Sequence, residues 1–300
     1  MARVAHQVRH ASAGPFHQEF SMKFGLAVFA TDQGLTPADL ARLAEDGGFE
    51  SLFLPEHTHM PVERTAHFKA EGGEVPPEYA RTLDPFVALA AAACATRTLK
   101  VGTGICLVSQ RDPITTAKEV ATLDHLSGGR FLFGVAAGWN REELQNHGTD
   151  PRRRLSVMAD RIKAMQAIWA QDVATYAGPH VTFDRIQSWP KPVQAPVPVL
   201  IGGNGPTVLD RVLAYGTEWL PEPAPDLTDR IAEFRERAHA AGWVDAPVTV
   251  YGCDPADVAR YAEAGVHRCV FWLPPGDAAG ARRRVSELRA SLGLDGQGRR

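Results

Sequence analysis

Short runs of apolar, β-branched and aromatic residues alternate along the chain with longer segments in which alanine and leucine recur at helical spacing. The short runs predict strands, and the longer segments predict helices. Eight strands are expected, at residues 23–29, 51–54, 100–105, 131–135, 197–201, 217–220, 248–251 and 268–273. Each is followed by a helix, at about residues 37–46, 85–95, 113–126, 151–170, 206–215, 227–241, 256–264 and 278–292.

Four of these helices carry the same start signal. A Thr or Asp side chain that can cap a helix is followed directly by proline, at Thr36, Asp84, Asp112 and Asp254. A capping oxygen satisfies a free amide of the first turn, and proline at the first helical position needs no amide partner. The signal therefore supports a helix start at each of these positions.

Eight strands and eight helices in strict alternation predict an α/β fold, a closed (β/α)8 TIM barrel. A doubly wound open sheet is the alternative. Its usual sign is a G-x-G-x-x-G loop directly after the first strand. That loop is missing, because Gly25 lies within the strand and the next glycine is Gly34.

Two connections are too long for plain loops. Residues 55–83 follow strand two at the end of the barrel where active sites lie, so we expect a lid over the substrate. Residues 171–196 precede strand five on the opposite side and are expected to cover or extend the fold. We expect residues 1–21 to be a disordered extension, 22–293 to be one domain and 294–300 to be a flexible tail.

Composition restricts the class of protein. The 300 residues carry 32 Lys and Arg against 35 Asp and Glu, a net charge of -3, which argues against a nucleic-acid binder. No stretch approaches the roughly 20 apolar residues that span a bilayer. None of the four cysteines has zinc-ligand spacing, so reduced thiols in a cytoplasmic protein are expected: Cys94, Cys106, Cys253 and Cys269.

Candidate chemistry lies where the strands end. Strand two runs into Glu56, His57 and His59, and the end of a barrel strand is where catalytic side chains are found. A metal site built on the two histidines is the weaker interpretation, because a catalytic zinc needs three protein ligands.

Small residues lie within or at the end of three other strands. Gly102 and Gly104 lie within strand three, and residues 136–138 (Ala-Ala-Gly) with Trp139 end strand four. Strand five ends in Gly202, Gly203, Asn204 and Gly205, and Pro206 is expected to begin the next helix. Free amides in such a loop before a helix can hold an anion, so we expect a phosphate there.

Other charged residues are expected to be structural. Asp124 and Arg130 are interpreted as an ion pair next to a helix stop. The runs Arg-Arg-Arg at 152–154 and at 282–284 are interpreted as solvent-exposed helix faces.

In this order the segments resemble the luciferase-like monooxygenase superfamily, and within it the branch that uses the deazaflavin coenzyme F420. The resemblance covers most of residues 22–221. Its most specific parts are residues 117–130 (AKEVATLDHLSGGR), 134–139 (GVAAGW), 190–194 (PKPVQ) and 201–203 (IGG). The C-terminal part matches in pattern only.

The resemblance implies a TIM barrel with the cofactor ring at its C-terminal face and the pair Glu56 and His57 near the reactive carbon. It implies a cis peptide bond between Gly104 and Ile105 behind the ring. Trp139 stands where a family dehydrogenase has an acid, and we expect it to stack on the substrate, with His59 nearby. The remaining cofactor contacts are expected from Ala136, Ala137, Gly138, Gly202, Gly203, Asn204 and Gly205.

The predicted function is therefore hydride transfer between F420 and a small organic substrate. The first alternative is a two-component monooxygenase that uses reduced FMN and O2. A non-catalytic flavin-binding relative and a metal-dependent barrel hydrolase are further alternatives. The sequence names neither the substrate nor the oligomeric state, for which a homodimer is one option.

Overall fold

A computed structural model describes residues 22–65 and 73–296. In this part of the chain, eight parallel strands form one sheet in the order β8-β7-β4-β3-β2-β1-β10-β9. Their bounds are β1 (Lys23–Ala27), β2 (Ser51–Leu54), β3 (Lys100–Leu107), β4 (Phe131–Ala136), β7 (Val199–Gly202), β8 (Glu218–Leu220), β9 (Thr249–Tyr251) and β10 (Arg268–Trp272).

The two edge strands, β8 and β9, meet and close the sheet into a barrel. Trp219 and Val248 form a parallel bridge, and the Trp219 amide donates to the carbonyl of Pro247 over 3.1 Å. Further along, the Tyr251 amide donates to the carbonyl of Pro221 over 2.8 Å. The predicted (β/α)8 TIM barrel is therefore confirmed.

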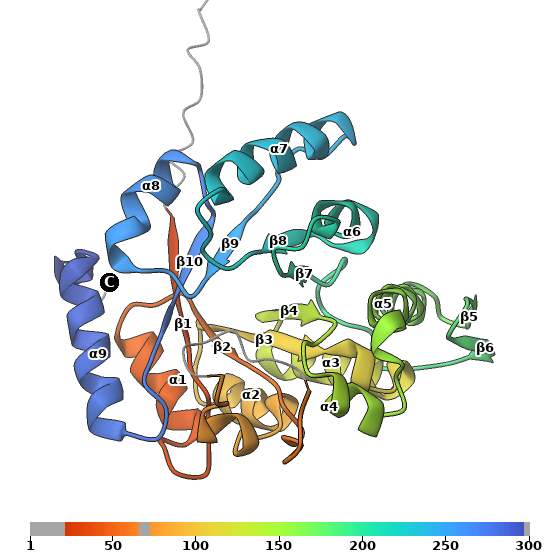
Figure 1. The fold of residues 1–300 in the computed structure, drawn as a ribbon, viewed down its shortest axis with the longest axis horizontal. Helices are drawn as coiled ribbons and strands as arrows, with labels where there is room; N and C mark the ends of the chain where they lie inside the picture. Colours follow the sequence, from red (N-terminus) through yellow and green to blue (C-terminus); the bar gives the residue numbers. More distant parts are fainter. Residues whose placement is uncertain (1–21, 66–72, 297–300) are drawn as a thin grey trace, which may run out of the picture.

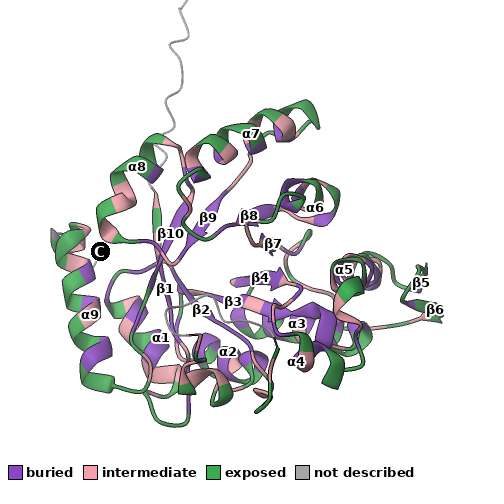
Figure 2. Ribbon diagram, in the orientation of Figure 1, coloured by how far each residue is buried: buried purple, intermediate pink, exposed green. Residues whose placement is uncertain are grey.

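Helices surround this barrel, and their inward faces are buried with the strands (Figures 1 and 2). Thr36, Asp84 and Asp112 cap their helices as expected, each accepting from the backbone amide three residues later. Asp254 instead opens a 3-10 turn, η4 (Pro255–Asp257). The helices are α1 (Pro37–Asp46), α2 (Pro85–Cys94), α3 (Pro113–Ser127), α4 (Arg141–Asn146), α5 (Arg154–Ala170), α6 (Val208–Tyr215), α7 (Leu227–Ala240), α8 (Val258–Glu263) and α9 (Ala278–Ser291).

Some boundaries differ from the prediction. Helix α4 was not predicted, and a 3-10 turn, η3 (Pro151–Arg153), precedes α5. Helix α6 begins at Val208, not at Pro206, because the Val208 amide still closes a turn to the carbonyl of Gly205 over 3.1 Å. Strand β1 ends at Ala27, two residues earlier than predicted.

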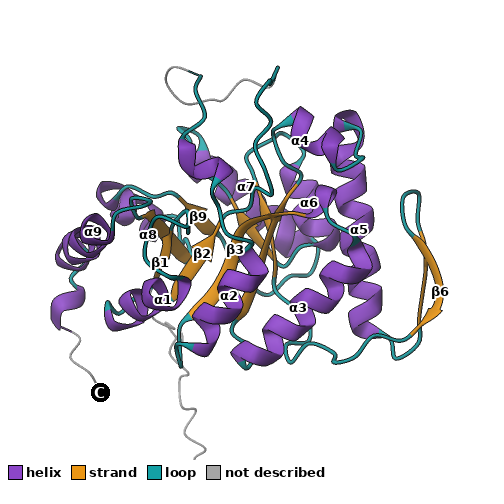
Figure 3. Ribbon diagram, turned by 90° about the horizontal axis from the view of Figure 1, so that it is seen from below, coloured by secondary structure: helices purple, strands orange, loops and turns teal. Residues whose placement is uncertain are grey.

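The two long connections have structure of their own. The described part of residues 55–83 contains a 3-10 turn, η1 (Pro77–Ala80). Residues 171–196 contain an antiparallel hairpin of β5 (Ala174–Ala177) and β6 (Thr182–Ile186), which projects beyond α5 and extends the fold (Figure 3). The predicted lid falls partly on residues 66–72, outside the described residues.

The first residues of the predicted tail have structure. Residues Leu294–Gly296 form a 3-10 turn, η5, in which Leu294 packs against the core and Asp295 pairs with Arg289. The predicted extension, 1–21, and residues 297–300 of the predicted tail lie outside the described residues. Among the helices described, none is both long and apolar enough to cross a membrane.

Asp124 and Arg130 do not form the predicted ion pair. Asp124 accepts from both the backbone amide and the side-chain amide of Gln194, at 2.8 and 2.7 Å. Arg130 instead donates to backbone carbonyls, among them those of Ser127 and Ala93 at 2.6 and 2.9 Å. Each side chain therefore forms hydrogen bonds with polar groups of neighbouring segments instead of with the other side chain.

A buried arginine ties together the strand starts at the N-terminal end of the barrel. Arg268, with 1% of its side chain exposed, pairs with Glu50 at 2.8 Å and Glu218 at 3.2 Å. Burial would raise the pKa of Glu50, but its hydrogen bonds and ion pairs with Arg268 and Lys100 outweigh burial and lower it to about 2. This cluster lies opposite to the end where barrels place active sites, so we assign it to stability.

We expect the Glu50 cluster to make the protein sensitive to acid. A carboxyl whose pKa is lowered in the folded state from 4.5 to about 2 binds its proton first in the unfolded state. Stability is then full above about pH 5 and is lost as the pH falls toward 2, by up to about 3 kcal/mol. Urea unfolding of the wild type and of Glu50→Gln, compared at pH 6 and pH 3, measures this loss. Equal losses in the two proteins would contradict the assignment.

Candidate functional site

A cavity of about 1170 Å³ lies at the C-terminal ends of the barrel strands. Such a volume exceeds the upper end of the range of about 300 to 1,000 Å³ usual for sites that bind one small molecule. All but one of the predicted site residues contribute to its lining, and only His59 does not. The contributing residues are Glu56, His57, Gly104, Ile105, Ala136, Ala137, Gly138, Trp139, Gly202, Gly203, Asn204 and Gly205.

One wall of the cavity is formed by the small residues of β3, β4 and β7. The peptide bond between Gly104 and Ile105 is cis, as the resemblance implies. A Cβ atom on Gly202 would lie 3.2 Å from both the Ile105 side chain and the Val135 carbonyl, so little room is left for a side chain there. Gly203 has φ 109°, and Cβ atoms on Gly203 or Gly205 would meet nothing within 4 Å. Residues 202–205, which we call the glycine loop, therefore face open space at this wall at Gly203 and Gly205.

The glycine loop is held by the backbone of Glu222 and by Arg230 of α7. The Asn204 side chain donates to the carbonyl of Glu222 over 2.8 Å and accepts from its amide over 3.0 Å. Arg230 donates to the carbonyl of Asn204 over 2.6 Å and to that of Gly205 over 3.1 Å. This arrangement fixes the loop and places a guanidinium behind it, which makes the loop attractive to an anion.

His57 is paired with a glutamate that the sequence analysis did not find. Its Nδ1 lies 3.0 and 3.2 Å from the two carboxylate oxygens of Glu143. The Glu143 side chain is 1% exposed and that of His57 is 7% exposed. Since Nδ1 is engaged, Nε2 is the nitrogen available for proton exchange with a bound molecule.

Helix α4 positions Glu143. Its N-cap Asn140 is fully buried and accepts from the Glu143 amide over 3.2 Å. A carboxylate in the first turn of a helix is favoured by the helix dipole. The sequence carries a signal for this arrangement, because a capping residue followed three positions later by Glu marks a helix start.

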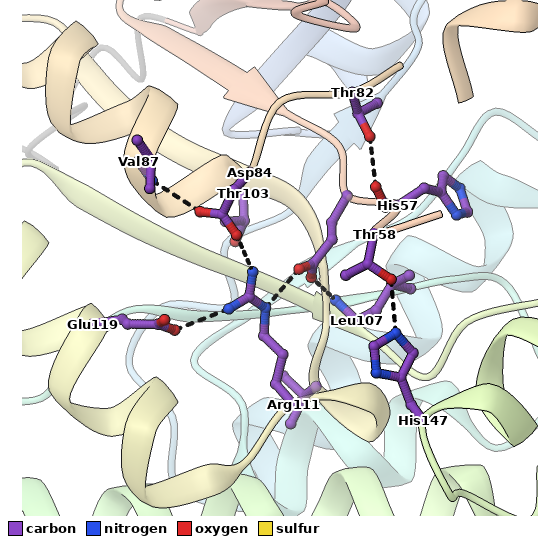
Figure 4. A network of polar contacts seen from close by, with 12 residues as sticks. His57, Thr58, Thr82, Asp84, Val87, Thr103, Leu107, Arg111, Glu119 and His147 are labelled. Atoms are coloured by element: carbon purple, nitrogen blue, oxygen red, sulfur yellow. Dashed lines mark hydrogen bonds and ion pairs between the residues drawn. The ribbon is translucent and has the colours of Figure 1, made fainter. Parts of the chain in front are cut away.

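Glu56 joins a second network, centred on Arg111 (Figure 4). Its carboxylate accepts from the Leu107 amide and from Arg111 Nε, both over 2.6 Å. Arg111 also contacts Asp84 at 2.7 Å and Glu119 at 3.0 Å. Burial would lower the pKa of Arg111, but Glu56 and the other carboxylates raise it above its usual value. The network joins the ends of β2 and β3 to α2 and α3, and so fixes the backbone that carries His57.

His59, in contrast, does not line the cavity. Its Nδ1 lies 2.9 Å from the Thr58 hydroxyl, and its Nε2 lies 2.9 Å from the side-chain amide of Asn146. Its ring is 5.4 Å from that of His147, whose pKa is lowered by burial and by the neighbouring His59. The structure therefore gives His59 a contact with α4 and no place in the lining.

Two arginines in the lining were not predicted as site residues. Arg141, at the start of α4, and Arg154, at the start of α5, both border the cavity. The run 152–154 was predicted to be a solvent-exposed face, which holds for Arg152 at 89% exposure but not for Arg154. The run straddles a helix start, so its members point in different directions.

The sequence model for luciferase-like monooxygenases matches residues 24–291. The chain belongs to this family. The barrel described above is therefore that of a luciferase-like protein.

Relatives within the family differ in the cofactor that their names give. An uncharacterized protein of Mycobacterium tuberculosis is 40% identical over 278 residues, 90% of this chain and 99% of its own length. The FMNH2-dependent dimethylsulfone monooxygenase of Pseudomonas fluorescens is 30% identical over 60% of this chain and 45% of its own. The F420-dependent glucose-6-phosphate dehydrogenase of Nakamurella multipartita is 26% identical over 62% of this chain and 51% of its own.

The fold also matches solved structures. A monooxygenase from Streptomyces bottropensis superimposes with a TM-score of 0.75 at 19% identity, over 91% of this chain and 99% of its own. At this identity the match supports the fold alone. The family is established by the match over residues 24–291, and the names of the relatives give both F420 and FMN as cofactors.

Proposed function

We propose that this luciferase-like oxidoreductase transfers a hydride between coenzyme F420 and a small organic substrate, with His57 as the residue that exchanges the accompanying proton. The observation that carries the proposal is the His57–Glu143 pair at 3.0 Å in the wall of the cavity. A histidine oriented by a buried carboxylate is the usual arrangement of a general acid or base.

The residues present fit a deazaflavin. In the wall of Gly104, Ile105 and residues 136–138, all side chains except that of Ile105 are small, which leaves room for a flat ring. The open glycine loop, backed by Arg230, suits the phosphate of the cofactor. When bound, the cofactor supplies or accepts the two electrons of the hydride.

The protein's own share of the reaction is positioning and proton transfer. In the direction of reduction, the substrate carbon gains a hydride, and the adjacent heteroatom gains a proton from His57 Nε2. In the direction of oxidation, the same nitrogen accepts the proton. Glu143 stabilises the charged imidazole and holds its orientation, while Glu56 acts through Arg111 on the backbone. We propose that Trp139, whose ring is 6.1 Å from that of His57, contacts the substrate.

An FMN-dependent monooxygenase is the second candidate. It is supported by the 30% identity to a monooxygenase whose name specifies reduced FMN. FMN also has a flat ring and a phosphate, so the same wall and the same loop would serve it. The two candidates differ in cofactor preference.

We expect F420 to bind with a Kd at least about tenfold lower than that of FMN, a difference of about 1.4 kcal/mol. The experiment titrates the protein with each cofactor, oxidised and reduced, and follows the quenching of the protein's tryptophan fluorescence, since Trp139 and Trp272 line the cavity. Equal or tighter binding of FMN would overturn the F420 proposal and favour the monooxygenase.

A variant in the glycine loop tests the phosphate contact in the same titration. Gly205→Asp adds a carboxylate without backbone strain, because Gly205 has no positive φ and its Cβ would meet nothing within 4 Å. Charge repulsion should raise the cofactor Kd by about tenfold or more. Gly205→Ala is the matched control and should bind like the wild type. Unchanged affinity in Gly205→Asp would place the phosphate elsewhere.

A further inference from the structure

A second part of the cavity lining is built from aromatic rings. Phe29 follows β1, Tyr251 ends β9, Trp272 ends β10, and Tyr79 lies on η1 in the first long connection. All four line the cavity. We call these four residues the aromatic wall. Its chemistry differs from that of the small residues of β3, β4 and β7, and the two walls meet where Tyr251 lies against Gly104.

The rings of the aromatic wall form a continuous surface. The Phe29 and Trp272 rings are stacked, with centroids 5.3 Å apart and an interplanar angle of 11°. The Tyr79 ring lies 4.5 Å from that of Phe29, and Tyr251 meets Trp272 edge-on at 5.2 Å. The wall ends next to His57, whose ring is 5.0 Å from that of Tyr79. A molecule on this surface therefore lies within reach of the residue proposed to exchange the proton.

Packing of the barrel does not require Trp272 at this position. The preceding four residues of β10 are buried, whereas Trp272 is 36% exposed and faces the cavity. A large apolar side chain left exposed in a concave site is typical of a binding surface.

The aromatic wall is also uncharged. Burial, with the neighbouring charges of Glu78 and Glu222, raises the pKa of Tyr79 to about 12. Burial likewise raises the pKa of Tyr251 well above its usual value. Both phenols therefore stay protonated at neutral pH, and the Glu222 carboxylate, which acts on both, also borders the cavity.

We propose that the aromatic wall binds the substrate, and that the substrate class is a planar aromatic compound. The inference rests on the proposed function, because it assigns the glycine-lined wall to the cofactor. Stacked and edge-on rings gain energy beyond the area they bury. A saturated ring of the same size buries similar area but lacks this gain, so the wall selects for planarity.

A matched pair of probes tests the selectivity. We expect the cofactor-saturated protein to bind 2-naphthol about fivefold to tenfold more tightly than its saturated counterpart, decahydro-2-naphthol, by isothermal titration calorimetry. Trp272→Leu keeps an apolar side chain but removes the ring, and should reduce this preference to about twofold or less. Tyr79→Leu, which lies outside the barrel sheet, should reduce it as well. Trp189→Leu, a tryptophan 55% exposed and outside the cavity lining, is the control and should keep it.

The outcomes separate this inference from the proposed function. No preference for naphthol in the wild type, or an unchanged preference in both wall variants, would overturn the aromatic substrate even if F420 binds as expected. The probe titrations are repeated without cofactor, so failure of F420 to bind overturns the proposed function and still leaves the wall measurable. The wall variants should keep the cofactor Kd of the wild type. A Kd raised tenfold in them would assign the wall to the cofactor and overturn the inference.

Discussion

Replacement of His57 by alanine should lower kcat by about 10² to 10⁴ and change the cofactor Kd far less. The range is that of a positioned general acid or base. His57 combines a place in the cavity wall with a buried carboxylate on Nδ1. Steady-state kinetics with reduced F420 and an accepted substrate measure kcat, and fluorescence titration measures the cofactor Kd. A loss confined to cofactor affinity would make His57 a binding residue.

Two further variants locate the proton carrier. Glu143→Gln keeps the shape of the side chain but removes the charge that stabilises the imidazolium, so it should also lower kcat and shift the pH profile of kcat. His59→Ala is the matched control from the same strand end, and it should retain wild-type kcat because His59 lies outside the cavity lining. If activity is lost in His59→Ala and not in His57→Ala, the proton carrier lies two residues further along.

The barrel could be predicted because its signals are local. Thr36, Asp84 and Asp112 each cap a helix through an amide three residues later. The alternation of strand and helix patterns then restricts the topology to few choices. The hairpin at 174–186 and helix α4 were missed because both lie in connections, where a short element has too few residues to show a period.

The positions of the site residues could also be predicted, but their partners could not. Glu56 and His57 are adjacent in the sequence, yet adjacent residues of an extended segment point to opposite sides. His57 turns to Glu143, 86 residues away, and Glu56 turns to Arg111, 55 residues away. Contacts of this separation depend on how the barrel closes, which no local pattern specifies.

The same argument explains the arginine runs. Arg152 and Arg154 are two positions apart at the start of a helix, and one is solvent-exposed while the other borders the cavity. Composition alone gave both the same assignment. The direction of each side chain is determined only once the helix has docked on the barrel.

The Arg111 network should have the largest effect on stability. Arg111→Ala removes the shared partner of three carboxylates, and the Glu56 side chain, 1% exposed, is left as a buried charge. Breaking a buried pair in this way costs about 3 to 5 kcal/mol in the free energy of unfolding. Urea unfolding at neutral pH measures the loss. The matched control is Arg81→Ala, whose ion pair with Asp32 is 40% and 56% exposed and should contribute at most about 1 kcal/mol.

A second substitution separates the charge effect from loss of packing. In Arg111→Ala with Glu56→Gln, the carboxylate that lost its partner becomes neutral, so part of the stability should return. If the double variant is no more stable than Arg111→Ala, the loss comes from the packing of Arg111 over the ring of Phe86, 4.7 Å away. Since Glu56 directly precedes His57, the single variant should also lower kcat at temperatures where it remains folded. The double variant should not recover that kcat, because a neutral amide in place of the Glu56 carboxylate gains no ion pair to hold the end of β2.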